Sequence, residues 1–223
     1  MPPSATPGKT SRNRTCRWAA PWREFLFWLL LVPASAALSS GMRTRQLIGS
    51  IETCAFLAVA ISSAGRMKSL GLEFIAWERI PRSAVLSSAT IGFAAGLVVL
   101  GIARWSRQPL GIEYGWNIAV LVIVVGPALE EIIFRGYLLT LAISLTSRMP
   151  RCISSAVSII GVAVAFGAAH LGRTGITILQ FVCIIFTGSV YGWMRLYCGS
   201  TLAAVISHAT YNWALYMSAC CRI

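Results

Sequence analysis

Long, nearly uncharged apolar runs recur along this chain and constrain its fold more than any other feature. The run at 84–103 is about 20 residues long, the length that an α-helix needs to cross the hydrocarbon core of a bilayer. Further runs of this kind lie at 152–170, 176–197 and 201–221. With 57% hydrophobic and only 12% charged residues, the composition is not that of an ordinary soluble domain. The sequence therefore predicts an all-α, polytopic bundle of transmembrane helices that forms one unit.

The N-terminal part of the chain contains less regular segments. Residues 1–23 are polar and basic, and we expect a disordered tail on the cytoplasmic side, because basic flanks favour that side. The apolar run at 25–38 is interpreted as a first span, although the small residues near its end also fit a cleaved signal peptide. A second candidate span at 47–64 is weakened by Glu52, and 65–83 is a charged connection. About seven spans are expected in total, within a range of roughly six to eight.

The charge balance is strongly basic. The chain has 19 Lys and Arg against 7 Asp and Glu, a formal net charge of +12, which in a soluble protein would suggest nucleic acid. Here the basic residues lie mostly in the short connections between apolar runs, where anionic lipid headgroups attract them. We therefore expect a multi-pass protein of the cell membrane that contacts lipids and binds no nucleic acid.

The run at 114–145 carries two adjacent carboxylates, Glu130 and Glu131. Ionisable groups at membrane depth are expensive to bury, so the pair is a functional hypothesis by default. Arg135 lies one helical turn after Glu131 and can pair with it, whereas Glu130 points about 100° away and can face a cavity. The run is too long for one straight crossing, and Gly126–Pro127 is the expected break or kink. In the alternative, the helix ends there and both carboxylates are solvated in the first turn of the next helix.

The two histidines of the chain both lie in the late apolar runs. His170 ends a Phe-x-x-x-His pattern that begins at Phe166, and His208 begins a His-x-x-x-Asn pattern that ends at Asn212, on the same helical face. Glu130 and His170 each lie about 20 residues from the turn between their runs, so antiparallel helices would bring them to similar depth. The alternative is that each histidine is only a hydrogen-bonded contact between helices.

Taken together, Glu130-Glu131-x-x-x-Arg135, Phe166-x-x-x-His170 and His208-x-x-x-Asn212 resemble the three-motif signature of the CPBP (Abi) family. That family comprises the Ras-converting type of CAAX prenyl endopeptidases and the bacteriocin-processing and immunity proteins. The resemblance covers roughly the last half of the chain. It implies a catalytic membrane core at 111–221, preceded by the tail at 1–23 and by membrane segments without a recognisable motif at 24–110.

The resemblance also implies a role for each matched residue. Glu130 and His170 would hold and activate the attacking water, and His208 and Asn212 would stabilise the oxyanion. The supporting residues would be Glu131, Arg135 and Phe166. The implied substrate is a peptide or protein, and whether it is lipidated is left open.

Several alternatives compete with this mechanism. Glu130, His170 and His208 would also suit a catalytic zinc site, since two histidines and one carboxylate form an open zinc set. We favour catalysis without a cofactor. The chain has no aspartate and no His-Glu-x-x-His, which excludes a two-aspartate protease and the usual zinc helix. A non-proteolytic scaffold or immunity protein and a small proton-coupled transporter are the remaining hypotheses, although a transporter usually shows internal repeats that are not seen here.

Overall fold

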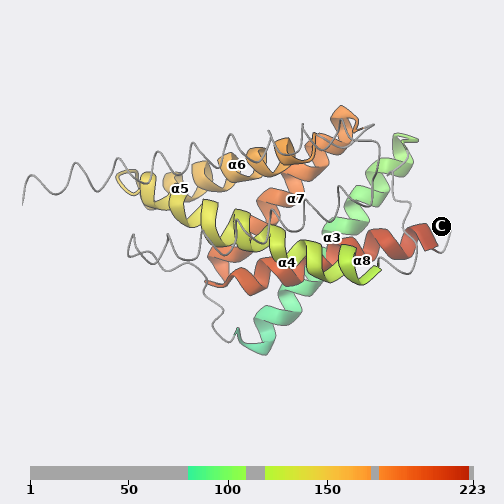
Figure 1. Cartoon of the computed structure of the whole chain (residues 1–223), viewed down its shortest axis with the longest axis horizontal. Coiled ribbons are helices and arrows are strands. Elements are labelled where there is room, and N and C mark those ends of the chain that lie inside the picture. The colour runs from blue at the N-terminus through green and yellow to red at the C-terminus, as the bar shows by residue number, and fades with distance from the viewer. Residues whose placement is uncertain (1–79, 109–118, 172–175, 221–223) are drawn as a thin grey trace, which may run out of the picture.

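The computed structural model describes residues 80–108, 119–171 and 176–220, and every regular element within these ranges is helical (Figure 1). In chain order, with η for π-helices, the elements are α3 (Arg82–Trp105), η2 (Leu121–Val125), α4 (Gly126–Glu131), η3 (Ile132–Leu138), α5 (Leu139–Leu145), α6 (Arg151–Ala169), α7 (Ile178–Tyr197) and α8 (Thr201–Cys220). The expected all-α class is confirmed for this part of the chain. The tail at 1–23, the runs at 25–38 and 47–64 and nearly all of 65–83 lie outside the described residues, so the span count stays a prediction.

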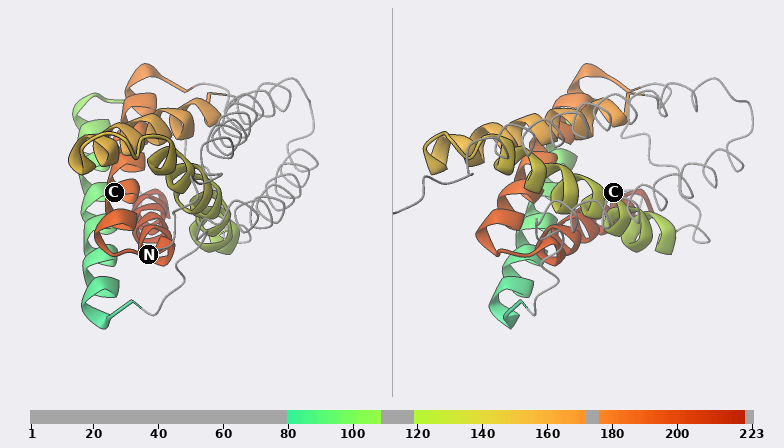
Figure 2. Two further views of the ribbon diagram at one scale, coloured as in Figure 1. Left: turned by 90° about the vertical axis from the view of Figure 1, so that its left-hand side faces the viewer. Right: turned by 60° about the vertical axis from the view of Figure 1, so that its left-hand side comes forward.

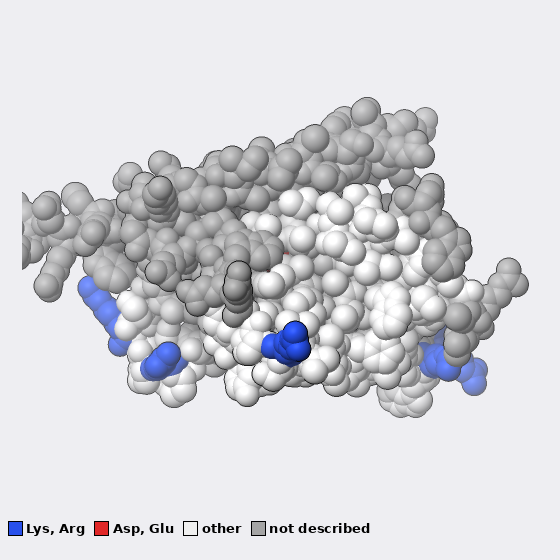
Figure 3. Space-filling model, turned by 90° about the horizontal axis from the view of Figure 1, so that it is seen from below, with Lys and Arg blue, Asp and Glu red and all other residues white. Residues whose placement is uncertain are grey.

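Three of the described helices are long and apolar enough to cross a membrane, namely α3, α6 and α7. Each lies within a few residues of the run that predicted it. The fourth predicted run forms α8, which equals α7 in length but carries more polar residues and is not one of the three. The described surface in Figure 3 is largely uncharged, with Arg side chains scattered over it. Such a surface suits contact with lipid, and the basic side chains suit its edges.

A break or a kink was expected at Gly126–Pro127. The helix continues from 119 to 145, so the break is wrong, and the kink stays a prediction. Proline cannot donate a backbone hydrogen bond, and in a regular α-helix its ring clashes with the carbonyl four residues earlier. The chain avoids this clash by widening into the π-helix η2, in which Gly126 N–H donates to the carbonyl of Leu121, five residues back. A second π-helix, η3, follows α4 directly. The α4 turn with its two carboxylates is thus flanked on both sides by π-helices, which frequently occur at functional sites.

Helix α3 crosses α8 at very close range, and the two helices lie against each other in Figures 1 and 2. A Cβ atom added at Gly92 would collide with the carbonyl oxygen of Ser207 and with Thr210 Oγ1. Gly96, one turn later, also faces α8. Small residues let helix backbones approach closely. Because Ser207 directly precedes His208, this crossing lies next to His208 on α8.

The buried apolar residues form two clusters with a polar group between them. One cluster comes from η3, α5 and α6 and includes Phe134 and Phe166. The other comes from α3, α7 and α8 and includes Tyr191. The ring of His208 contacts Phe166 of the first cluster and Tyr191 of the second. The candidate site therefore lies where the two halves of the described bundle meet.

Candidate functional site

The two carboxylates of α4 occupy different environments. The side chain of Glu131 is completely buried, whereas 29% of the Glu130 side chain is exposed. This difference follows from their positions on the helix, since adjacent residues point about 100° apart. The alternative in which both carboxylates are solvated in a first helical turn is wrong. Glu130 is therefore the partly exposed carboxylate, and Glu131 belongs to the interior.

Arg135 neutralises the buried carboxylate. Its Nη1 donates to Glu131 Oε1 at 2.9 Å, and both side chains have no exposed surface, which confirms the pairing expected from their spacing. Its Nη2 donates to the carbonyl of Gly188 on α7 at 2.8 Å. A Cβ atom at Gly188 would lie 3.0 Å from Nη2 and 3.1 Å from Phe166, so a glycine leaves the space that the guanidinium occupies. The part played by Gly188 was not expected from the sequence.

His208 is held by both carboxylates and by an aromatic ring. Its Nδ1 lies 2.9 Å from Glu131 Oε1, and its Nε2 lies 3.9 Å from Glu130 Oε2. Tyr191 of α7 stacks on the imidazole with ring centroids 4.6 Å apart and planes at 17°. Since an ionised carboxylate only accepts hydrogen bonds, Nδ1 is the donor to Glu131. These contacts orient the ring so that Nε2 faces the exposed carboxylate.

His170 lies at the end of α6 and is also held in one orientation. Its Nδ1 is 2.8 Å from the carbonyl oxygen of Phe166. Because a carbonyl only accepts, Nδ1 carries the proton, and in the neutral ring Nε2 is the nitrogen that can accept one. The ring centroid of Phe166 lies 4.7 Å from that of His170 and 5.9 Å from that of His208. Phe166 thus packs against both histidines, as expected for a residue beside the site.

Asn212 makes a contact that the sequence did not suggest. Its Nδ2 donates to the backbone carbonyl of Val122 in η2 at 2.9 Å. The amide therefore links α8 to the helix that carries the two carboxylates. Its expected part in oxyanion stabilisation stays a prediction.

The side chains that would form a zinc site do not gather. Within residues 80–108, 119–171 and 176–220, no three His, Cys, Asp or Glu side chains lie close enough together to hold one metal ion. His208 also uses Nδ1 for its bond to Glu131. The geometry of Glu130, His170 and His208 does not fit a preformed metal centre, and no step below is assigned to one.

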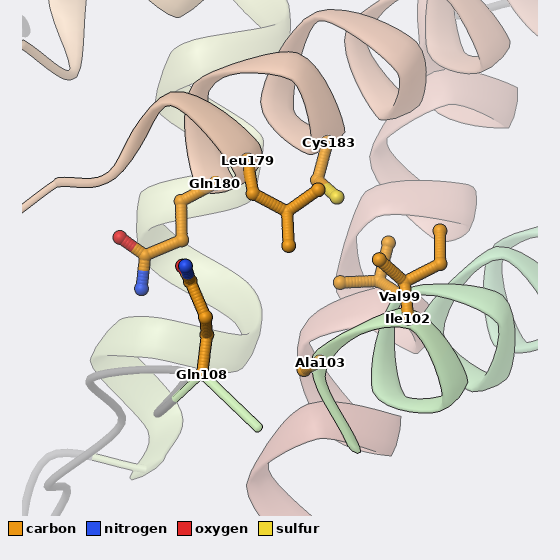
Figure 4. Close-up of a pocket in the computed structure, with 7 residues that line it drawn as sticks. All are labelled: Val99, Ile102, Ala103, Gln108, Leu179, Gln180 and Cys183. Atoms are coloured by element: carbon orange, nitrogen blue, oxygen red, sulfur yellow. The ribbon is translucent and has the colours of Figure 1, made fainter. Parts of the chain in front are cut away.

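A small pocket lies away from these residues, between the end of α3 and the first turns of α7 (Figure 4). Its walls are mostly apolar, with two carboxamides, Gln108 and Gln180, at one side. Its volume of about 20 Å³ has room for about one water molecule. None of the motif residues lines it, so it is not the candidate site.

Comparison with known proteins agrees with the motif pattern. Residues 112–214 match the family model described as Rce1-like, type II CAAX prenyl endopeptidase. All three motifs lie inside this range, and the match confirms the resemblance. The comparisons with curated proteins and with solved structures gave no match.

Proposed function

We propose that this chain, whose residues 112–214 belong to the Rce1-like family of type II CAAX prenyl endopeptidases, is an intramembrane endopeptidase. It would be a multi-pass protein of the cell membrane and would cleave a peptide or protein, with prenylated C-terminal peptides as the first substrate class to test. One observation carries the proposal. A partly exposed carboxylate, Glu130, lies 3.9 Å from an imidazole, His208, whose other nitrogen is bound to a buried carboxylate.

In the proposed reaction, a water molecule is held by Glu130 and His170. The carboxylate of Glu130 and the unprotonated Nε2 of His170 are both proton acceptors. One of them takes a proton from the water as its oxygen attacks the scissile carbonyl carbon. The same proton then passes to the leaving nitrogen as the carbon–nitrogen bond breaks. A positioned acid–base group of this kind typically contributes about 10²–10⁴-fold in rate.

The charge on the attacked carbonyl oxygen requires a donor, and we assign this role to His208. With a proton on each ring nitrogen, His208 donates through Nδ1 to Glu131 and through Nε2 to the oxyanion. The site then carries no net charge, because the two carboxylates balance the Arg135 guanidinium and this imidazolium. A neutral set of groups suits a desolvated site. The second amide hydrogen of Asn212 adds a further donor. One such donor typically contributes about 3–4 kcal/mol to the transition state.

The decisive test is Glu130→Gln. The amide keeps the size of the side chain but cannot take a proton, so we expect turnover to fall by at least about 10²-fold while the substrate still binds. Cleavage of prenylated and matched unprenylated peptides is measured with purified protein in liposomes, together with binding by the inactive variant. Glu130→Asp, which keeps a carboxylate, is the matched control and should retain part of the activity. Full turnover by Glu130→Gln would contradict the mechanism, and a wild type that cleaves neither peptide while binding them would favour a non-proteolytic member of the family.

A further inference from the structure

The carbonyl of Val122 is left without a backbone donor by the shape of its helix. In η2 the hydrogen bonds span five residues, and Gly126 N–H donates to Leu121 instead of to Val122. With the same spacing, the carbonyl of Val122 would accept a hydrogen bond from the N–H of residue 127. That residue is Pro127, which has no N–H to donate. A backbone carbonyl at membrane depth needs another hydrogen-bond donor, because lipid offers none.

Asn212 is that partner, and its bond to Val122 links two helices of the candidate site. Asn212 lies one helical turn after His208 on α8, and Val122 lies about two turns before Glu130 on the helix 119–145. The Asn212–Val122 bond therefore joins the helix of His208 to the helix of Glu130. A further side-chain hydrogen bond between these helices runs from His208 to Glu131. Together the two bonds determine how Glu130 and His208 face each other.

We infer that Asn212 is a positioning residue, which places Glu130 against His208 by binding the carbonyl that η2 and Pro127 leave unpaired. The inference rests on the proposed function for its effect on catalysis, but the bond itself can be tested without any substrate. It differs from a role restricted to the oxyanion, because such a role would not depend on Pro127.

The first measurement is hydrogen exchange by mass spectrometry on the full-length protein in detergent, without substrate. Asn212→Leu keeps a side chain of similar size and removes the donor. We expect faster exchange in peptides that cover 119–131, because the helix loses its link to α8. Ser218→Ala is the control, since it removes a hydrogen bond that stays within α8, from Ser218 Oγ to the carbonyl of Leu215. Unchanged exchange at 119–131 in Asn212→Leu would overturn the inference.

The second measurement is a double-mutant cycle with Pro127→Ala. An alanine at this position restores a backbone N–H, so the Val122 carbonyl obtains a donor from its own helix, whether that helix stays widened or returns to α geometry. In the wild-type background, Asn212→Leu should lower kcat by about 10²-fold with KM nearly unchanged, as expected for a misplaced catalytic group. In the Pro127→Ala background, the loss should shrink by about tenfold or more, because the two changes act on one bond. This smaller loss of kcat in the Pro127→Ala background distinguishes positioning from a contribution to folding alone.

Each possible result of these two experiments either supports or overturns the positioning role of Asn212. Equal loss of kcat in both backgrounds would show that Asn212 acts only on the oxyanion and would overturn the inference. If Pro127→Ala does not fold, the exchange experiment decides alone. If the wild-type protein cleaves no peptide, the proposed function fails, whereas the exchange experiment still shows whether Asn212 holds the two helices together.

Discussion

At the scale of single residues, Arg135 is the side chain on which the site depends most. It is completely buried, donates to Glu131 and to the carbonyl of Gly188, and lies with its guanidinium carbon 4.4 Å from the ring centroid of Phe166. Glu131 Oε1 accepts from both Arg135 and His208. The guanidinium therefore balances the buried charge of Glu131 and holds that carboxylate where it orients His208. A planar group with fixed donors suits this task better than an ammonium group does.

Arg135→Ala should consequently harm folding as well as activity. It leaves the Glu131 carboxylate buried without its partner, a change that typically costs about 3–5 kcal/mol. His170→Ala should remove activity with less loss of stability, because His170 lies at the end of α6 and is only partly buried. Thermal unfolding in detergent measures both, with Arg104→Ala on the exposed end of α3 as the control, expected within about 0.5 kcal/mol of wild type. A greater destabilisation by His170→Ala would reassign that histidine to a structural role.

At the scale of elements, α3 supports the site although it lies outside the residues that match the family. It packs on α8 through Gly92, beside the carbonyl of Ser207. The next residue is His208, so a displacement of α8 at this crossing moves an imidazole of the site. We therefore expect the face of α3 that carries Gly92 to help position the motif residues on α8, although α3 carries no motif residue itself.

Gly92→Ala tests this dependence. The added methyl group has no space at the crossing, so the helices must separate, and overpacking of this kind typically costs about 1–3 kcal/mol. We expect lower thermal stability together with lower kcat. Gly101→Ala on the same helix is the matched control, because a Cβ atom there meets nothing within 4 Å and alanine favours the helix. Equal behaviour of the two variants would mean that the α3–α8 crossing does not position His208.

At the scale of the whole molecule, the described bundle places one polar group between two apolar clusters. Glu131 pairs with Arg135 and His208, and Glu130 lies beside His208, inside a structure whose described surface is largely uncharged on the face seen in Figure 3. Charges in such a setting are tolerated when they are paired and hydrogen-bonded. The described residues therefore place a partly exposed carboxylate, Glu130, beside one imidazole, that of His208, within this polar group.

From the arrangement of the candidate ligands we predict that the proposed peptide cleavage does not depend on a metal ion. A zinc centre needs three protein ligands at about 2.0–2.2 Å with their outer partners satisfied, and no such trio gathers in the part of the chain that the structure describes. Purified protein should keep its activity after exhaustive chelation and should contain no stoichiometric zinc by elemental analysis. Activity that is lost on chelation and restored by zinc would make His170 and His208 ligands instead.

The sequence by itself determined the features that depend on neighbours along the chain. The apolar runs placed α3, α6, α7 and α8 within a few residues, because the length and polarity of a run are local properties. The pair Glu131–Arg135 followed from a spacing of four residues on one helix. Of the break or kink expected at Gly126–Pro127, the break does not occur, because the rule for proline assumes α-helical spacing, whereas a helix that widens to π spacing accommodates the ring.

The tertiary structure alone decided which side chains complete the site. Gly188 and Arg135 are 53 positions apart, Glu131 and His208 are 77 apart, and Val122 and Asn212 are 90 apart. Such contacts depend on how far each helix rotates about its axis and how closely it approaches its neighbours. An apolar run in a membrane leaves both undetermined, since lipid and protein are almost equally favourable surroundings for its side chains. Close packing at Gly92 and the hydrogen bonds of buried polar groups select one arrangement, and that arrangement brings Glu130 and His208 together.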